Sequence, residues 1–195
     1  MSKINDLRIH AAQNKPDVIA LNEIKPKNGS IPEPRSFNIP GYTPYTNKLE
    51  DPDVRGICIY VRNCFKSNLI CIPDHNFKDV ATVSINTQNS CVMIQCIYRS
   101  GTVSKAKQLD EEFHKLLRKT TAIKGYNQKI TVGDFNLNKI RWTPEPIIPD
   151  HIPDNSTEHK FVDLLHDIHV TQHVGTETRY REGHTPTIGD LILTT

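Results

Sequence analysis

The sequence predicts a mixed α/β fold, because segments with the two-residue period of strands alternate with segments that have the spacing of amphipathic helices. The 195 residues suit one domain with a sizeable core. Apolar residues make up 36% of the chain and are spread along its whole length, and no charge block or biased composition marks a disordered part. We therefore expect a single domain over residues 1–195, without a linker or an internal repeat.

The first part of the chain is predicted to hold one helix and one buried strand. Residues 4–14 carry apolar residues at helical spacing, and Pro16 ends the helix. The run DVIAL at 17–21 is short and apolar, as expected for a buried strand. Residues 25–42 are rich in Pro, Asn, Gly and Ser and are predicted to form a loop.

Three strands are predicted in the next part. Residues 56–63 alternate with strand period, which puts Cys58 and Tyr60 on the face opposite the isoleucines. The runs at 79–85 and 90–98 predict two more strands, arranged as a meander.

Two helices are predicted in the second half, each with an apolar stripe. Residues 104–123 form the longest helix, for which Ser104 suits the N-cap, and residues 156–168 form another, capped by Ser156 or Thr157. The stripes consist of Leu109, Phe113, Leu116 and Leu117, and of Phe161, Leu164, Leu165 and Ile168. A buried strand at 129–136, a proline-rich loop at 143–153 and a final strand from Asp190 to the end complete the chain.

Charge and cysteine content narrow the class of protein. With 24 basic and 22 acidic residues the net charge is +2, which neither indicates nor excludes a nucleic-acid partner. The five cysteines are odd in number and form no C-x-x-C, so buried reduced thiols are expected rather than zinc ligands or disulfides. Neither a signal peptide nor an apolar run of membrane-spanning length is present, so we expect an intracellular protein, nuclear or cytoplasmic, that is not secreted and has no membrane partner.

The stretch GDFN at 133–136 is the first candidate for chemistry. Along a strand, residues i and i+2 point the same way, so Asp134 and Asn136 are expected to share a face while Phe135 faces the packing. A carboxylate can fix or deprotonate a water, and an amide can contact the same water and a phosphate oxygen. The alternative is a turn in which the two side chains bond the backbone.

Other polar residues stand at the ends of predicted strands. Glu23 follows one, Tyr98 ends one and Asp190 begins one, so these groups can converge with Asp134 at one sheet edge. All are oxygen donors, which favours a hard cation such as Mg²⁺ over zinc.

Three histidines, His166, His169 and His173, have a spacing that occurs in metal sites. The reading we favour is a partly exposed helix end, because no second cluster of ligands accompanies them.

Five segments together carry a family resemblance: NKPDVIALNEI, GICIYVRN, CIYRS, ITVGDFNLNKIRW and TETRYREGHTPTIGDLILTT, in this order. The chain resembles the endonuclease/exonuclease/phosphatase superfamily, and more narrowly the apurinic/apyrimidinic-type endonuclease domain of non-LTR (LINE-like) retrotransposons, which accompanies a reverse transcriptase. The resemblance implies a four-layer α/β sandwich, in which two packed mixed β-sheets are flanked by helices. It also implies Mg²⁺-dependent hydrolysis of DNA phosphodiesters.

The resemblance assigns roles to individual residues. Glu23 matches the Mg²⁺-binding glutamate, and Tyr98 matches the tyrosine near the scissile phosphate. Asp134 matches the aspartate that positions or deprotonates the attacking water, and Asn136 matches the asparagine that holds this water and the phosphate.

The last part of the chain matches less completely. Asp190 matches the aspartate that orients a catalytic histidine, and Thr178 and Thr187 match substrate-binding hydroxyl positions before it. The family's first-strand asparagine and its final Ser-Asp-His have no counterpart, and Gly189 replaces a usual aliphatic residue. On this basis we expect the domain to be incomplete at both termini and its hydrolysis to be impaired.

Whether the chain is an enzyme therefore stays open in the sequence. The first hypothesis is a Mg²⁺-dependent retrotransposon-type DNA endonuclease domain. The alternatives are a non-catalytic remnant of such a domain with weak nucleic-acid binding, and a phosphatase on the same scaffold.

Overall fold

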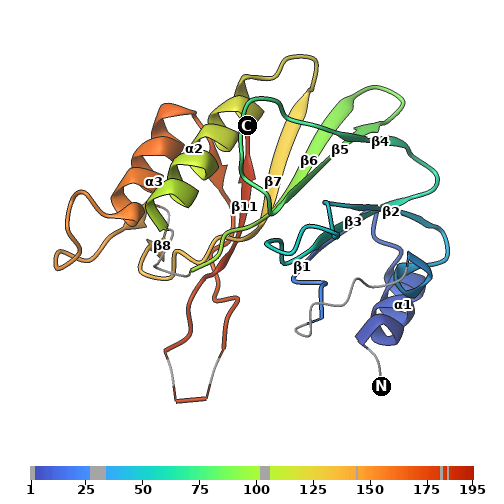
Figure 1. Cartoon of the computed structure of the whole chain (residues 1–195), viewed down its shortest axis with the longest axis horizontal. Coiled ribbons are helices and arrows are strands. Elements are labelled where there is room, and N and C mark those ends of the chain that lie inside the picture. The colour runs from blue at the N-terminus through green and yellow to red at the C-terminus, as the bar shows by residue number, and fades with distance from the viewer. Residues whose placement is uncertain (1–2, 27–33, 102–105, 144, 181, 184) are drawn as a thin grey trace.

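The computed structural model describes residues 3–26, 34–101, 106–143, 145–180, 182–183 and 185–195 (Figure 1). The helices are α1 (Lys3–Asn14), α2 (Ala106–Ala122) and α3 (Thr157–Asp167), with a short 3-10 helix at Pro34–Phe37. The strands are β1 (Val18–Asn22), β2 (Tyr42–Thr46), β3 (Ile57–Arg62), β4 (Lys66–Ile70), β5 (Val80–Asn86), β6 (Cys91–Tyr98), β7 (Gln128–Asp134), β8 (Arg141–Trp142), β9 (Pro146–Ile147), β10 (Thr171–Gln172) and β11 (Asp190–Thr194).

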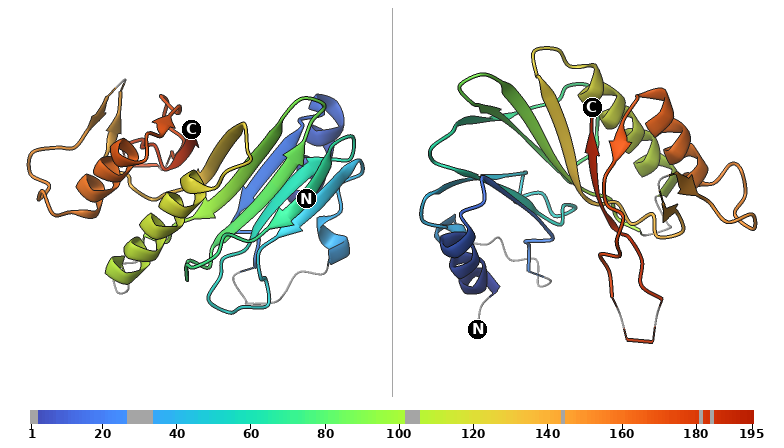
Figure 2. Two further views of the ribbon diagram at one scale, coloured as in Figure 1. Left: turned by 90° about the horizontal axis from the view of Figure 1, so that it is seen from above. Right: turned by 180° about the vertical axis from the view of Figure 1, so that it is seen from behind.

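The layers run from α1 through two sheets to α2 and α3, which gives the predicted four-layer α/β sandwich (Figures 1 and 2). The small sheet has the order β1-β3-β2 and is antiparallel throughout. The large sheet has the order β10-β11-β7-β6-β5-β4 and is mixed, because β6 and β7 pair in parallel. The expectation of two mixed sheets is thus wrong for the small sheet, in which β3 follows β2 along the chain as its antiparallel neighbour and β1 pairs antiparallel with the other edge of β3.

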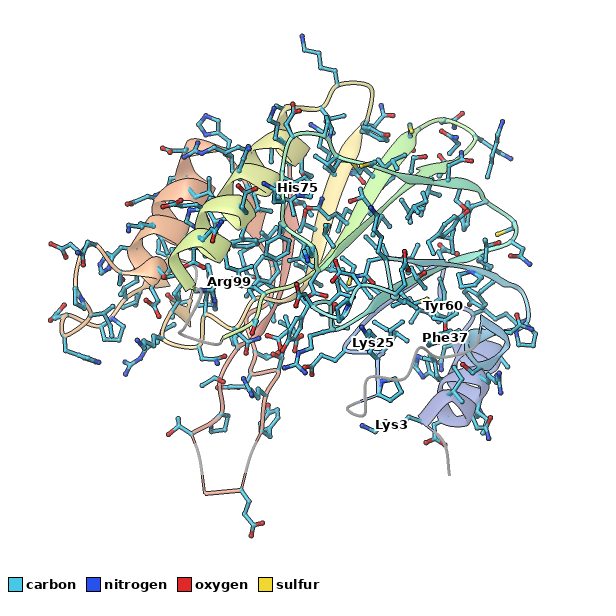
Figure 3. All side chains as sticks on the ribbon, in the orientation of Figure 1. Lys3, Lys25, Phe37, Tyr60, His75 and Arg99 are labelled. Atoms are coloured by element: carbon cyan, nitrogen blue, oxygen red, sulfur yellow. The ribbon has the colours of Figure 1, made fainter. Side chains whose placement is uncertain are left out.

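Strand β3 lies in the middle of the small sheet, and its two sets of side chains lie on opposite faces, as its alternation predicts; both faces are buried. Ile57 and Ile59 pack between the two sheets, whereas Cys58 and Tyr60 pack on the other face, in the cluster that contains Ala11 of α1 (Figure 3). A strand covered on both faces carries apolar side chains at successive positions.

An aromatic cluster joins the large sheet to its helices. The rings of Phe113 on α2 and Phe161 on α3 have centroids 5.8 Å apart, and the ring of Phe135 lies 5.7 Å from the first and 5.8 Å from the second. All three side chains are fully buried. Because Phe135 directly follows β7, this packing anchors the loop after that strand to both helices.

The register of the large sheet aligns three of the predicted site residues. Tyr98 at the end of β6 pairs with Asp134 at the end of β7, and Asp134 pairs with Asp190 at the start of β11. Gly133 makes this arrangement possible, since its φ is 145° and an added Cβ would lie 1.8 Å from the carbonyl oxygen of Ile97. Only a residue without a side chain lets β7 approach β6 this closely.

Several strands escape prediction. Strand β2 contains Pro44, β4 is rich in polar residues, and β8, β9 and β10 have only two residues each. Such strands have no alternation long enough to recognise, and tertiary pairing forms them. Part of the loop expected at 25–42 forms the 3-10 helix, and the chain enters β2 at its end.

The helix stripes and one cap are confirmed. Phe113, Leu116 and Leu117 of α2 are buried, as are Phe161 and Leu164 of α3. The hydroxyl of Ser156 accepts a hydrogen bond from the backbone N–H of His159, so this serine is the N-cap of α3. The other predicted cap, Ser104, lies outside the described residues.

The five cysteines are free, as expected, but not all of them are buried. Cys58 and Cys96 lie in the core, whereas Cys64 and Cys71 are exposed. Both exposed thiols lie next to β4, at the end of the large sheet's order, where fewer neighbours cover them. In the described part of the chain, no helix is both long and apolar enough to span a membrane.

Gly133→Ala should destabilise the protein by about 3 kcal/mol or more, because the new methyl group can fit only if β7 moves away from β6. Chemical denaturation followed by circular dichroism measures the loss. The control is Gly175→Ala, where an added Cβ meets no atom within 4 Å. Equal stability of the two variants would contradict the close approach of β6 and β7.

Candidate active site

Tyr98, Asp134 and Asp190 form a row across three neighbouring strands at one edge of the large sheet. The pairings of β6, β7 and β11 put them side by side. Tyr98 is buried, Asp134 is half-buried and Asp190 is exposed, so the row runs from the interior toward solvent. The structure thus brings together three residues that are far apart in the sequence.

Glu23 joins this row from the small sheet. It follows β1 with a φ of 55°, in the left-handed region that non-glycine residues seldom adopt. Burial, a side-chain hydrogen bond with Glu23 and the negative charges of Glu23 and Asp134 raise the pKa of Tyr98 to about 12. Glu23 and Asp134 therefore lie on the same side of the sheets, as the sequence predicts.

The carboxyl group of Asp134 is the most perturbed acid of the row. Burial raises its pKa to about 6, with further raising by the charges of Asp190 and Glu23, against lowering by the Asn136 N–H and by Arg179. A carboxyl with a pKa near neutrality can accept a proton from water and later release it, as a general base requires.

Asn136 lies beside Asp134 for a reason other than strand alternation. Strand β7 ends at Asp134, and Asn136 has a φ of 49°, which is not a strand conformation. The rule that residues two apart along a strand share a face therefore does not apply to this pair. The backbone N–H of Asn136 instead donates to Asp134 Oδ1 at 3.0 Å, and Asn136 Nδ2 donates to the carbonyl of Arg99 at 2.8 Å. The alternative turn reading is thus correct locally, and the turn holds the two side chains together.

Thr178 and Thr187 form hydrogen bonds near the start of β11. The hydroxyl oxygen of Thr178 accepts the backbone N–H groups of Gly189 at 3.1 Å and Asp190 at 3.0 Å. The Thr187 hydroxyl donates to Asn138 Oδ1 at 3.4 Å. These contacts fix the backbone at Asp190, and they leave a substrate-binding role of the two threonines as a prediction.

A buried ion pair that the sequence analysis missed supports the loop after β7. Arg99 and Asp110 are both buried, with Arg99 Nη2 2.7 Å and Nε 2.8 Å from Asp110 Oδ1, and Arg99 Nη1 donates to the carbonyl of Phe135 at 3.2 Å (Figure 3). Thr157, at the start of α3, donates to Asp110 Oδ2 at 2.7 Å. One network therefore connects α2, α3 and the backbone that carries Asn136.

Arg179 is a second residue that the sequence analysis missed. It lies in the hairpin that precedes β11 and projects from the sheets in Figure 1. Its Nη1 donates to Asn136 Oδ1 at 3.1 Å, and its charge lowers the pKa of Asp134. Nothing in the local sequence TETRY distinguishes this arginine from a solvated one, because its partner is 43 positions away.

The donor set suits a hard cation in its chemistry, although it forms no closed cage. Glu23, Asp134 and Asp190 supply carboxylate oxygens whose charges repel one another, and a cation would relieve this repulsion. Among the described residues, however, no group of three or more His, Cys, Asp or Glu side chains is placed to hold a metal ion. His166, His169 and His173 are exposed; His166 lies in the last turn of α3, His169 just beyond the helix and His173 directly after β10.

Two hollows border the row of residues. One, of about 370 Å³, lies between β1 and the strands of the large sheet, and Asp190 and Asn22 line it. The other, of about 360 Å³, is lined by Tyr98 together with Asp79 and Glu112. The candidate residues therefore stand between two hollows rather than in one enclosed cleft.

A family model described as endonuclease-reverse transcriptase matches residues 92–195. The chain is also similar to the solved endonuclease domain of TRAS1, a telomere-specific non-LTR retrotransposon, with 13% identity and a TM-score of 0.68, over 98% of this chain and 78% of that one. No curated protein sequence matches the chain.

Two further structures share the fold. D. rerio TDP2 complexed with a single-strand DNA product has 12% identity and a TM-score of 0.61, over 98% of this chain and 76% of that one. An endonuclease/exonuclease/phosphatase family protein from Leptotrichia buccalis has 12% identity and a TM-score of 0.56, over 100% of this chain and 81% of that one. The architecture is therefore the endonuclease/exonuclease/phosphatase fold.

Asp110→Asn should cost roughly 3 kcal/mol of stability, because it leaves the Arg99 charge buried without its counterion. Asp167→Asn is the matched control, since Asp167 of α3 pairs with Arg118 of α2 at 2.8 Å but both side chains are more than half exposed. That loss should be about 1 kcal/mol or less. Denaturant titration compares the two, and similar losses would contradict the importance of the buried network.

Asp134→Asn should stabilise the protein at pH 7 by on the order of 1–2 kcal/mol, less than the full pKa shift would give because the group is only half-buried. The carboxyl has a higher pKa in the folded state than in the unfolded state. As the pH rises from 4 to 6, it therefore ionises more readily in the unfolded chain, which opposes folding. Asparagine does not ionise and avoids this cost. The gain should be absent at pH 4. Denaturation at both pH values measures it, and a pH-independent difference would contradict a raised pKa.

Proposed function

The chain belongs to the endonuclease-reverse transcriptase family, and from this premise we propose that it hydrolyses DNA phosphodiesters with Mg²⁺ as cofactor, as one domain over residues 1–195. The observation that carries the proposal is the half-buried Asp134, with a pKa of about 6, next to the fixed amide of Asn136. A base and a polar contact at this spacing suit the activation of a water beside a phosphate.

In the proposed reaction, Asp134 accepts a proton from water as the water oxygen bonds to phosphorus. The bond from phosphorus to one ester oxygen breaks and this oxygen takes up a proton from solvent, while Asp134 later releases its proton to solvent. The products are an alcohol and a phosphate monoester. Asn136 holds the water and a phosphate oxygen through its amide, whose orientation the Arg99 carbonyl maintains. Tyr98 has a pKa of about 12 and stays protonated at neutral pH, so its hydroxyl can donate a hydrogen bond to a phosphate oxygen.

Asp190 and Glu23 complete the proposed site. Asp190 lies beside Asp134, where it can orient a cationic or imidazole side chain. Glu23 would hold Mg²⁺, with the neighbouring carboxylates as further oxygen ligands, and the ion would offset negative charge on the phosphoryl oxygens. Because the described ligands form no cage, this binding should be weak.

DNA is the substrate class that the relatives favour. The printed descriptions of the similar structures include a retrotransposon endonuclease domain and a protein bound to a single-strand DNA product. A phosphatase on this scaffold is a weaker candidate, since the family match is to endonuclease-reverse transcriptases.

The protein should nick supercoiled plasmid with Mg²⁺ but not with EDTA, and the rate should rise with pH through about 6 as Asp134 ionises. Asp134→Asn should lower the rate by about 10²-fold or more, because the general base is lost. The control Asp167→Asn lies at an exposed surface pair and should keep the rate.

Two outcomes would reject this function. DNA binding without Mg²⁺-dependent nicking would instead support the non-catalytic remnant. Hydrolysis of a phosphate monoester without any nicking would support the phosphatase.

A further inference from the structure

The proposed site is rich in negative charge. The charges of Glu23 and Asp190 contribute to the raised pKa of Asp134, and a phosphodiester is itself an anion. Such a substrate can enter only if positive charge compensates the carboxylates. Besides Mg²⁺, this charge has to come from side chains close to the row.

Arg179 has the position for this task. Of the charged side chains that influence the ionisation of Asp134, it is the one cation among the described residues. Arg55, by comparison, is exposed, and its charge lowers the pKa of Tyr98. The Arg179 charge therefore lies next to both members of the Asp134–Asn136 pair.

The backbone at Arg179 is held in place by the hairpin. Its N–H donates to the carbonyl of Thr187 at 2.9 Å, and its carbonyl accepts the Thr187 N–H at 3.1 Å. The half-buried side chain then reaches Asn136 Oδ1 with Nη1. A guanidinium carries five N–H donors in a planar fork, whereas this amide oxygen is a single neutral acceptor.

A phosphate oxygen is a better acceptor for this fork than the amide. Charge-assisted bonds of arginine to phosphate are shorter and roughly twice as strong as bonds to neutral acceptors, and two can form in parallel. Asn136 would not be released by the exchange, because its Nδ2 stays bonded to the Arg99 carbonyl. The amide oxygen thus stands in for a phosphate oxygen when no substrate is bound.

We propose that the Arg179 guanidinium binds the phosphodiester at this site, exchanging its contact with Asn136 Oδ1 for phosphate oxygens. The proposal rests on the proposed function for the identity of the site, but its central claim is a phosphate contact and not a rate. Arg179 is then a substrate-binding residue, and the hairpin before β11 contacts the phosphodiester through it.

Binding and nicking are measured separately for the wild type, Arg179→Met, Arg179→Lys and the control Arg118→Met, an exposed arginine on α2. The binding probe is a short single-stranded oligonucleotide in EDTA, titrated at several salt concentrations. Arg179→Met should bind roughly tenfold more weakly. Its salt slope should fall by about 0.7, as expected for one lost phosphate contact on a single strand.

Arg179→Lys should recover part of the affinity, since it keeps the charge but not the fork. Arg118→Met should match the wild type. In nicking assays, Arg179→Met should also move the acid limb of the pH profile upward, because Asp134 then faces Glu23, Asp190 and the neutral Tyr98 hydroxyl without the cation. A purely structural role of Arg179 would not change the salt slope.

The contact between Arg179 and phosphate can also be tested on the wild type, so that the result does not depend on whether a variant folds. The side-chain Nε–Hε NMR signal of Arg179 should shift on titration with a dinucleoside monophosphate, and that of Arg118 should not. An unmoved Arg179 signal, or unchanged affinity and salt slope in Arg179→Met, would overturn the proposal while wild-type nicking leaves the function standing. Arg179-dependent binding without nicking would sustain the contact and reject the nuclease, and a wild type that neither binds nor nicks would reject both.

Discussion

The parallel pairing of β6 with β7 is the interaction on which the site depends. It brings the end of β6 level with the end of β7, so that Tyr98 and Asp134 become neighbours, and the pairing of β7 with β11 adds Asp190. Gly133 permits this close approach, since any side chain there would meet the backbone of Ile97. The side chains of the site are thus positioned by strands that backbone hydrogen bonds hold together. Such strands are more rigid than loops.

Two kinds of interaction hold the loop after β7, and they differ in their environment. Behind the loop, Phe135 packs in the aromatic cluster and Arg99 joins Asp110 in a buried ion pair. In front of it, half-buried and exposed charges crowd together, and Glu23 and Asn136 both adopt left-handed backbone conformations. Strain and repulsion of this kind lower stability, and they are found where function requires fixed polar groups. The buried supports offset these costs.

Sequence patterns predicted the helices and strands whose apolar residues recur with a clear period. They also predicted that polar residues at strand ends come together. The stripes of α2 and α3, the alternation of β3 and the gathering of Glu23 with Asp134 agree with the structure. Contacts that depend on long-range pairing were not predictable, since Arg179 meets Asn136 across 43 positions and Thr157 meets Asp110 across 47. The relation of Asp134 to Asn136 was expected from strand alternation, but a turn with positive φ produces it.

The central claim is that the edge formed by β6, β7 and β11 receives a phosphodiester. A crystal structure of the protein with Mg²⁺ and a slowly hydrolysed phosphorothioate dinucleotide tests it most directly. The account predicts that the phosphorus lies beside the Asp134 carboxylate and the Asn136 amide, with the ion at Glu23. A nucleotide bound away from this edge, while Asp134 and Asn136 contact only protein, would contradict it.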